Sequence, residues 1–456
     1  MEPRIRERFA GNREDFTPIL FTLPAINAFF MNHHIVLIGA GSLWGPLCIM
    51  DFCARKTFDG STIVLVDIHA ERLHWAAAYA RRIAAQAGRK LCITTETDLS
   101  RALPGASHVL VAVAVGGDLF WRQDVRLPQR HGVYQSVGDT VGPGGFFRGW
   151  RHMKFYEGLL PLMGKYCPDA LLINLANPMN ILCRFVERTS PIRCIGLCHG
   201  VEDSRRILAE DEAFEPADVN ILAAGNNHFL FALDIRLQGR DGLEMIRGKS
   251  DEFWRRHGVL ADFWRRFDTF TINYDRHPAE FVPFYLTEQN GWGEKLGVPR
   301  EPREFQWREE VDPLQRLKAL AQDPAEIEIR RTTEPVADLI ELASGVRDGV
   351  LHLNIPNANA IPGVPACGNV EIPVHFEGGE MAPMADLKLP GGVRFWVSRT
   401  CEVQELVVDA FLSRKRRDAI VALGADALVN DYEKAERIFD ALYAAQKDYL
   451  PELRDA

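Results

Sequence analysis

The fold is decided by the stretch His34-Ile-Val-Leu-Ile-Gly-Ala-Gly-Ser-Leu-Trp-Gly45, in which an apolar run ends in a glycine turn before a helix opens. Doubly wound sheets use this arrangement to present backbone N–H groups to the pyrophosphate of a dinucleotide. Gly39 and Gly41 match the glycine fingerprint, whereas Trp44 takes the third position and Gly45 follows one place late. The stretch therefore predicts a dinucleotide site, with a plain glycine turn between strand and helix as the alternative.

A second apolar run, Ser61-Thr-Ile-Val-Leu-Val-Asp67, ends in an acid. In a dinucleotide-binding domain this position supplies the acceptor for the hydroxyls of the adenine ribose. Because a carboxylate repels a 2′-phosphate, Asp67 favours NAD over NADP.

Size and composition are those of a large globular enzyme. The 456 residues are enough for two or three domains, and 47% of them are hydrophobic and 25% charged. The net charge of −9 argues against a nucleic-acid surface. No apolar run reaches the roughly 18 residues that a membrane span requires. Residues 1–32 do not resemble a signal peptide and are predicted to be an extension without chemistry. The nine cysteines, an odd number, favour free thiols in a reducing cytoplasm.

Apolar, strand-like runs alternate with helical patterns up to residue 198. The predicted strands are His34–Ile38, Thr62–Asp67, Cys92–Thr95, His108–Val115, Leu171–Leu175 and Cys194–Cys198; the clearest helix is Glu71–Gln86. This alternation is typical of an α/β fold with a Rossmann-like, doubly wound parallel sheet. We assign this NAD-binding domain to residues 33–198.

Residues 199–456 are predicted to form a mixed α+β domain for substrate, metal and oligomer contacts. Its expected strands are Ile221–Leu237, Val350–Ile355 and Val370–Phe376, and its expected helices are Asp251–Phe267, Asp312–Gln322, Arg399–Arg416 and Tyr432–Gln446. The order of the two parts corresponds to that of lactate and malate dehydrogenases.

Polar residues gather where the predicted strands end, which is where such a sheet binds its ligands. Gly116 and Gly117 follow the fourth strand and permit close approach of the nicotinamide half of a cofactor. The glycine-rich stretch from Tyr134 to Arg148 is predicted to be a substrate loop, and Asn177 follows the fifth strand with its amide available to a sugar hydroxyl or the cofactor. The predicted cofactor-binding residues are Gly39, Gly41, Ser42, Leu43, Asp67, Gly116, Gly117 and Asn177.

Cys198 ends the sixth strand, and His228 follows thirty residues later. By spacing alone this pair is weak evidence for a metal, since a buried cysteine beside a hydrogen-bonded histidine is common. Ionisable residues are also dense from Tyr274 to Glu280, where a charged surface loop is the alternative.

Four motifs together resemble glycoside hydrolase family 4, the NAD- and divalent-metal-dependent glycosidases. They are Gly-Ala-Gly-Ser at 39–42, Asn-Pro-Met at 177–179, Gly-Leu-Cys-His-Gly at 196–200 and Asn-His-Phe at 227–229. The stretches 134–145 and 275–281 are most similar to the α-galacturonidase branch. The phospho-glycosidase branch usually has aspartate where this chain has His199, which argues against a 6-phosphosugar substrate.

The resemblance implies a redox route to hydrolysis, an exception to the two-carboxylate scheme. The sugar is oxidised at C3 by NAD⁺, a base removes the C2 proton, the aglycone leaves by elimination, and water and the hydride are then added. A divalent cation, Mn²⁺ or another, acts as Lewis acid on the C2 and C3 oxygens. By motif match its protein ligands are Cys198 and His228.

The resemblance also implies roles for the polar side chains. The base is Asp275, with the adjacent Tyr274 as its rival. Hydroxyl groups are bound by Asp139, Asn177 and His199, and either Asp139 or His199 assists the leaving group. By chemistry alone, the carboxylate of a uronic acid is expected to pair with Arg148 or Arg276.

Other interpretations remain at this stage. One is an NAD-dependent 2-hydroxy-acid dehydrogenase with the same nucleotide domain, and another is a non-catalytic NAD-sensing protein. Within the family, a glucuronide or a neutral hexoside could replace the galacturonide. A homodimer or homotetramer is expected only from the resemblance.

Overall fold

The computed structural model describes residues 32–454 apart from 212–213, 274, 307–311 and 333–334. The extension predicted for residues 1–32 therefore lies, except for its last residue, outside the described part of the chain. Among the helices that are described, none is long and apolar enough to cross a lipid bilayer.

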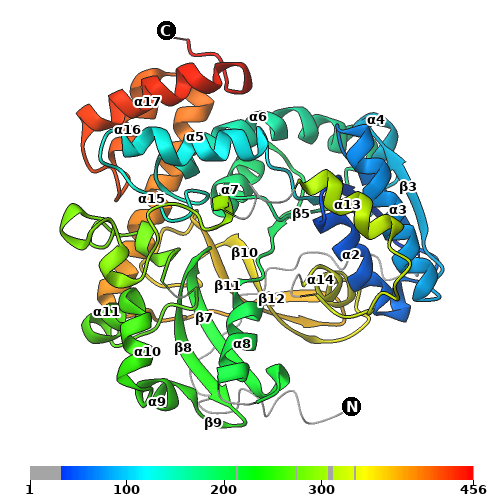
Figure 1. The fold of residues 1–456 in the computed structure, drawn as a ribbon, viewed down its shortest axis with the longest axis horizontal. Helices are drawn as coiled ribbons and strands as arrows, with labels where there is room; N and C mark the ends of the chain where they lie inside the picture. Colours follow the sequence, from blue (N-terminus) through cyan, green and yellow to red (C-terminus); the bar gives the residue numbers. More distant parts are fainter. Residues whose placement is uncertain (1–31, 212–213, 274, 307–311, 333–334, 455–456) are drawn as a thin grey trace.

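The first part of the chain, coloured blue to green in Figure 1, forms a parallel sheet in the order β3-β2-β1-β4-β5-β6. Its strands are β1 (His34–Ile38), β2 (Thr62–Val66), β3 (Cys92–Glu96), β4 (His108–Val111), β5 (Leu171–Asn174) and β6 (Cys194–Gly196). Every neighbouring pair is parallel. The strand order reverses between β1 and β4, the point at which such sheets bind ligands. The predicted Rossmann-like fold is confirmed.

Helices cover both faces of this sheet, with α2 (Trp44–Cys53) and α3 (Ala70–Gln86) on one face and α4 (Leu99–Ala102), α6 (Gly142–Tyr166) and α7 (Met179–Thr189) on the other. Helix α5 (Gly117–Gln129) packs on α6, and α8 (Gly200–Asp211) packs on the strand Val219–Asn226 of the second part. In α3 the buried positions Leu73, Ala76, Ala77, Ala80 and Ile83 recur at helical spacing. They form one apolar face, which packs on the sheet while the charged residues remain outside.

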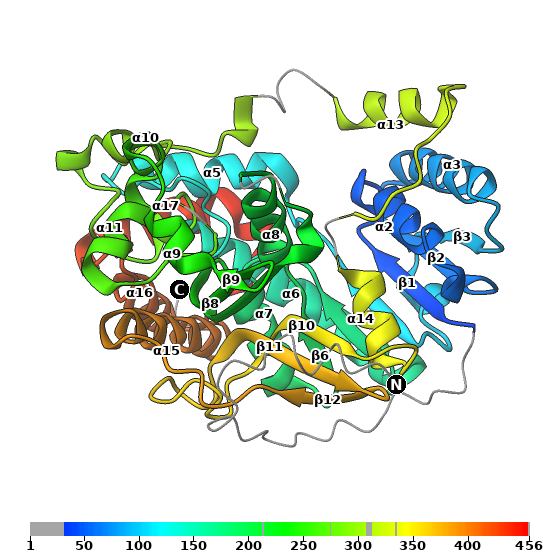
Figure 2. The same ribbon diagram turned by 90° about the horizontal axis from the view of Figure 1, so that it is seen from below.

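The sheet continues past β6 with antiparallel strands, in the order β6-β10-β11-β7-β8-β9 (Figure 2). These strands are β7 (Val219–Asn226), β8 (Phe229–Leu237), β9 (Arg240–Asp241), β10 (Gly349–Pro356) and β11 (Asn369–Glu377), with β12 (Glu380–Pro383) beside β11. The single strand predicted for Ile221–Leu237 is wrong. It is a hairpin, because Asn227 and His228 form a two-residue turn in which His228 has a φ of 65°.

The helices of the second part are α9 (Gly242–Arg247), α10 (Asp251–Arg256), α11 (Gly258–Phe267), α13 (Pro313–Gln322), α14 (Val336–Ala343), α15 (Gly391–Ser413), α16 (Arg416–Gly424) and α17 (Tyr432–Gln446). The helix predicted over Asp251–Phe267 is broken at His257, where the chain leaves helical geometry and α11 begins anew. Asp312 caps α13 as predicted, since its side chain accepts the N–H of Leu314. Short 3₁₀ helices cover Lys56–Phe58, Pro216–Asp218, Pro278–Glu280, Glu288–Asn290, Glu294–Leu296 and Lys447–Tyr449.

The two predicted domains share apolar cores. One cluster joins Leu37 of β1 and Ile173 of β5 to Leu339 of α14 and Ile372 of β11. In a second cluster the C-terminal helices α15–α17 pack on α6, above the sheet in Figure 1. The boundary at residues 198 and 199 stays a prediction, since the parallel pairing ends at β6 while the packing continues across it.

Candidate active site

The glycine turn after β1 is built for close backbone approach. A Cβ on Gly39, whose φ is +91°, would lie 2.6 Å from the carbonyl oxygen of Ala112. A Cβ on Gly45 would lie 2.6 Å from the carbonyl oxygen of Ala40, so Gly45 lets α2 pack against the turn. This is the contact for which the fingerprint uses its third glycine, here supplied one residue late.

Asp67 lies directly beside this turn. Its Oδ2 accepts the backbone N–H of Gly41 at 2.9 Å, and its Oδ1 accepts that of His69 at 2.9 Å. A Cβ on Gly41 would lie 2.6 Å from the carboxylate. The glycine turn and Asp67 therefore lie in direct contact, with no room for a side chain at position 39 or 41, and this arrangement fits the phosphate turn and ribose-binding acid of a dinucleotide site. Gly116 and Gly117 lie at the start of α5 with positive φ.

Three ionisable side chains come together from the loop between α5 and α6, the hairpin turn of β7 and β8, and the segment just before the 3₁₀ helix Pro278–Glu280. Asp139, His228 and His277 each offer one ligand atom, and these atoms lie within 4.8 Å of one another. The rings of His228 and His277 are 4.1 Å apart. His277 was not predicted as a site residue, although it belongs to the dense ionisable stretch of the sequence.

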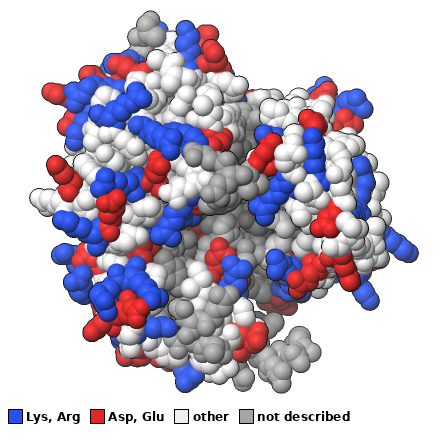
Figure 3. Space-filling model, viewed as in Figure 1, with Lys and Arg blue, Asp and Glu red and all other residues white. Residues whose placement is uncertain are grey.

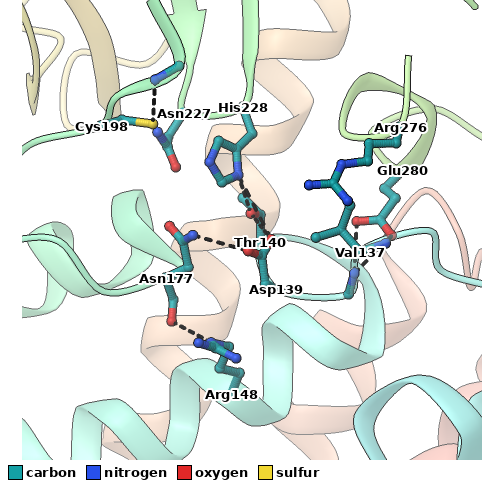
Figure 4. Close-up of polar contacts among 12 residues, drawn as sticks. Val137, Asp139, Thr140, Arg148, Asn177, Cys198, Asn227, His228, Arg276 and Glu280 are labelled. Carbon is teal, nitrogen blue, oxygen red and sulfur yellow. Dashed lines mark hydrogen bonds and ion pairs between the residues drawn. The ribbon is translucent and has the colours of Figure 1, made fainter. Parts of the chain in front are cut away.

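Asp139 is the hub of the polar contacts in this cluster (Figure 4). Its Oδ1 accepts the hydroxyl of Thr140 at 2.6 Å, and its Oδ2 accepts the amide of Asn177 at 3.1 Å. Nδ1 of His228 lies 2.8 Å from the same hydroxyl. The structure therefore brings together Asp139, Asn177 and His228, which were predicted from separate motifs.

The surroundings set the charges of the cluster. Burial alone would raise the pKa of Asp139, but the facing histidines and Arg148 outweigh it and hold the pKa below its usual value. Burial lowers the pKa of His228 to about 4, against the opposing effect of Asp139. Burial likewise lowers the pKa of His277. At neutral pH the cluster therefore pairs a carboxylate with two neutral imidazoles, which is a set of donors suited to a divalent cation.

Cys198 lies two residues beyond β6 and is buried. Its Sγ accepts the backbone N–H of Gly200, the first residue of α8, at 3.4 Å. Cysteine binds metals as the thiolate. Figure 4 shows Cys198 and His228 entering the site from the same side, although Cys198 is not one of the three clustered residues.

A row of paired residues, with Asn354 and Glu371 buried at its centre, connects the strands that lead to Cys198 and His228. Across β6, β10, β11 and β7, Gly196 pairs with Asn354, Asn354 with Glu371, and Glu371 with Gly225. Glu371 accepts the amide of Asn227 at 2.9 Å and so fixes the residue before His228. Burial raises the pKa of Glu371 to about 7. The sequence analysis missed this row, because its residues come from strands distant in the chain.

Two of the predicted segments are joined by another buried acid. Glu280 accepts the backbone N–H groups of Val137 and Gly138 at 2.7 and 3.0 Å, and the hydroxyl of Ser136 donates to the carbonyl of Arg276. The predicted substrate loop is thus fastened to the stretch 275–281. Glu280 was noticed in the sequence only as part of a charged run.

The remaining predicted residues are distributed around the cluster. Arg148 donates to the carbonyl of Asn177 at 3.1 Å, and Arg276 pairs with Glu304 at 2.8 Å. His199 lies 3.5 Å from Asp203 and its side chain is about half exposed, at 47%.

Asp275 has a different environment. Its Oδ1 accepts the backbone N–H groups of Val259 and Leu260 at 2.9 Å each, and its Oδ2 lies 2.8 Å from Nδ1 of His257. It therefore caps the start of α11 and does not belong to the Asp139 cluster. Its rival Tyr274 lies outside the described residues, so the identity of the base stays a prediction.

Comparison with known proteins gives relatives of several substrate classes. The alpha-galacturonidases of Thermoanaerobacterium saccharolyticum and Bacillus subtilis are each 28% identical, over 91% and 89% of this chain and 96% of each relative. The alpha-glucosidase of Erwinia rhapontici is 25% identical over 92% of this chain and 99% of that protein. The sugar therefore differs among relatives of similar identity.

The fold is also similar to that of solved structures. The 6-phospho-beta glucosidase of Thermotoga maritima, solved with manganese, NAD⁺ and glucose-6-phosphate, has a TM-score of 0.78 at 19% identity, covering 92% of this chain and 100% of its own. The family 4 glycosyl hydrolase model matches residues 34–213, and the model of the family's C-terminal domain matches residues 223–429. The chain belongs to family 4 of the glycosyl hydrolases.

Proposed function

We propose that this family 4 glycosyl hydrolase cleaves α-galacturonides with NAD⁺ and a divalent cation, Mn²⁺ or another. The observation that carries the proposal is the convergence of Asp139, Asn177 and His228 at the edge of the sheet that also holds the glycine turn. The two alpha-galacturonidases of similar sequence support the choice of sugar.

The residues present fit both cofactors. Gly39 and Gly41 form a turn in which a Cβ would collide with Ala112 or Asp67, and the Asp67 carboxylate beside it is proposed to accept the ribose hydroxyls. Ser42, Leu43, Gly116 and Gly117 complete the proposed NAD site, together with Asn177. When bound, NAD⁺ supplies a hydride acceptor and the cation supplies a Lewis acid. Cys198 and His228 are proposed to hold the cation.

The protein's own groups orient the sugar. Asn177 and Asp139 present an amide and a carboxylate to its hydroxyls, and His199 lies beside the proposed metal-binding cysteine. Asp139 or His199 is proposed to protonate the leaving group. Removal of the C2 proton is assigned to Asp275 or Tyr274. Because Asp275 already accepts two backbone N–H groups, it can act as the base only if its contacts with the start of α11 loosen.

An acidic sugar is proposed because two arginines, Arg148 and Arg276, lie near the cluster and can bind a carboxylate. Arg148 lies near enough to Asp139 to lower the pKa of that carboxyl, and Figure 4 shows Arg148 and Arg276 on different sides of the cluster. A guanidinium binds a carboxylate through two parallel N–H donors, so either arginine is a candidate for the uronate carboxylate. Figure 3 shows positive and negative side chains interspersed over the face of the molecule that it draws. We therefore assign recognition of the sugar carboxylate to the site itself.

A panel of nitrophenyl α-glycosides, assayed with NAD⁺, Mn²⁺ and dithiothreitol, tests the proposal. We expect cleavage of the galacturonide and little of the glucuronide, galactoside, glucoside and 6-phosphoglucoside. Cleavage of another sugar in preference would overturn the substrate. Full cleavage of the galacturonide after exhaustive chelation and removal of NAD⁺ would overturn the mechanism.

The requirement for a thiolate ligand places the enzyme in a reducing compartment, which we propose to be the cytoplasm. The nine cysteines all lie within the described residues, and none of them forms a disulfide. We further propose a homodimer or homotetramer, which sedimentation of the purified protein tests.

A further inference from the structure

Thr140 links two residues of the proposed site by short polar contacts. Its hydroxyl oxygen lies 2.6 Å from Oδ1 of Asp139 and 2.8 Å from Nδ1 of His228, while Asp139 Oδ1 and His228 Nδ1 are 3.8 Å apart. Thr140 is fully buried and His228 is 7% exposed. The Thr140 hydroxyl thus lies between the carboxylate of Asp139 and the imidazole of His228 and contacts both.

The directions of these hydrogen bonds follow from counting protons. A threonine hydroxyl has one proton to donate and lone pairs to accept with, and an ionised carboxylate only accepts. Asp139 also accepts the amide of Asn177, so it is surrounded by donors. The proton of Thr140 therefore goes to Asp139. The remaining bond requires that Nδ1 of His228 carries a proton and donates it to the Thr140 oxygen.

We propose that Thr140 is a positioning residue that holds His228 in the Nδ1–H tautomer and leaves its Nε2 lone pair for the cation. This rests on the proposed function in one respect, the assignment of His228 as a metal ligand. Histidine ligands generally donate their second ring N–H to a neighbouring acceptor, which fixes both tautomer and ring orientation.

The backbone places the ring independently of this hydroxyl. His228 has a φ of 65° in the turn between β7 and β8. The preceding Asn227 is held on both sides, since its N–H donates to Asn180 at 2.8 Å and its amide to Glu371 at 2.9 Å. Loss of the Thr140 hydroxyl should therefore change which nitrogen is protonated while the turn stays in place.

The test uses the full-length protein and two substitutions of matched shape. Thr140→Val keeps the branched side chain without the hydroxyl, and Thr140→Ser keeps the hydroxyl. Binding of Mn²⁺ alone is measured from the electron paramagnetic resonance signal of the free ion. We expect Thr140→Val to weaken Mn²⁺ binding roughly 10- to 100-fold, the usual effect of losing such a partner. Thr140→Ser should stay within about twofold of the parent on the same grounds.

A second measurement needs no metal. In protein labelled with ¹⁵N-histidine, long-range proton–nitrogen spectra report the tautomer of each ring, and His228→Ala identifies the His228 signals. We expect the Nδ1–H form in the parent and in Thr140→Ser, and a shift toward Nε2–H in Thr140→Val. The NAD⁺ affinity and melting temperature of Thr140→Val show whether it is folded.

An Nε2–H tautomer in the parent overturns the inference even if the valine variant does not fold. Unchanged Mn²⁺ affinity in folded Thr140→Val also overturns the inference about Thr140. In that case the proposed function still stands if His228→Ala has lost Mn²⁺ binding. If His228→Ala binds Mn²⁺ like the parent, the metal assignment fails and the inference fails with it.

Discussion

Oε1 of Glu280 lies 2.7 Å from the backbone nitrogen of Val137, a residue 143 positions earlier in the chain. The same oxygen accepts the N–H of Gly138 at 3.0 Å. One buried carboxyl thus satisfies two adjacent backbone donors in the loop that carries Asp139. The geometry of the proposed site depends on this contact between two distant segments.

Burial raises the pKa of Glu280 to about 8 from an ordinary value of 4.5, although the N–H of Val137 opposes the shift. Because the folded-state pKa is the higher one, this group's contribution to stability is complete below pH 4.5. It is then lost as the pH rises toward and through 8. We expect Glu280→Gln, which keeps the accepting oxygen without the charge, to remove this pH dependence.

Urea unfolding of the parent and Glu280→Gln between pH 5 and pH 9 checks this. The stability of the parent relative to the glutamine variant should fall over that range. Glu280→Ala leaves two buried N–H groups without an acceptor and should lower the free energy of unfolding by about 1–3 kcal/mol. A constant difference between parent and Glu280→Gln would contradict the raised pKa.

Cys198 and His228 are expected to be needed together for catalysis. A metal's stabilisation of developing charge contributes several kcal/mol, so Cys198→Ser and His228→Ala should each lower kcat/KM about 10²- to 10³-fold. Both should also weaken Mn²⁺ binding while leaving NAD⁺ affinity unchanged, as measured by calorimetry. Cys92→Ser is the matched control, because Cys92 is an exposed thiol on β3. Parent-like turnover in either ligand variant would disprove the metal assignment.

Much of the fold was predictable because its signals are local. The apolar runs of β1 and β2, the glycine turn and the acid at position 67 are each contained in a few residues. The hairpin of β7 and β8 was missed because neither residue of its two-residue turn, Asn227 and His228, is a glycine, and Gly225 lies within β7. The break at His257 was missed because the cap of α11, Asp275, comes from after the helix.

Of the residues in the proposed site, only those within recognisable sequence motifs were predictable. Asn177 and His228 were found from their neighbours in sequence, but Thr140, Glu280 and Glu371 act through partners 88 to 144 residues away. A single sequence carries no record of such pairs. His277 was visible in a dense ionisable stretch, yet its approach to His228 depends on tertiary structure.

Asp67 is expected to control the choice between the two nicotinamide cofactors. Its carboxylate already fixes the N–H of Gly41 and faces the proposed ribose position. Since a hydrogen bond to a charged group contributes about 1.5–3 kcal/mol, Asp67→Ala should weaken NAD⁺ binding about tenfold or more. Asp67→Asn removes the charge and keeps an acceptor, so it should gain NADP⁺ affinity. Calorimetric titration of both variants with both cofactors checks this, and unchanged preference would argue against the ribose contact.

The buried pair of Arg151 on α6 and Asp124 on α5 connects several elements of the helical layer. The guanidinium donates to both carboxylate oxygens at 3.0 and 2.6 Å, and both side chains are at most 1% exposed. Gln446 of α17 bonds to both partners, and Nε of Arg151 donates to the carbonyl of Val115, next to Gly116. The pair thus joins three helices to a loop of the proposed NAD site.

Arg151→Met leaves a buried carboxylate without its partner and should cost about 3–5 kcal/mol in urea unfolding. Adding Asp124→Leu removes the orphaned charge and should recover most of that loss, because well-packed apolar side chains often replace such pairs without penalty. The exposed pair of Arg101 and Glu96 is the control, and Arg101→Met should cost less than about 1 kcal/mol. If the double variant is no more stable than Arg151→Met, the lost stability comes from the contacts of Arg151 with Gln446 and Val115 and not from the unpaired charge.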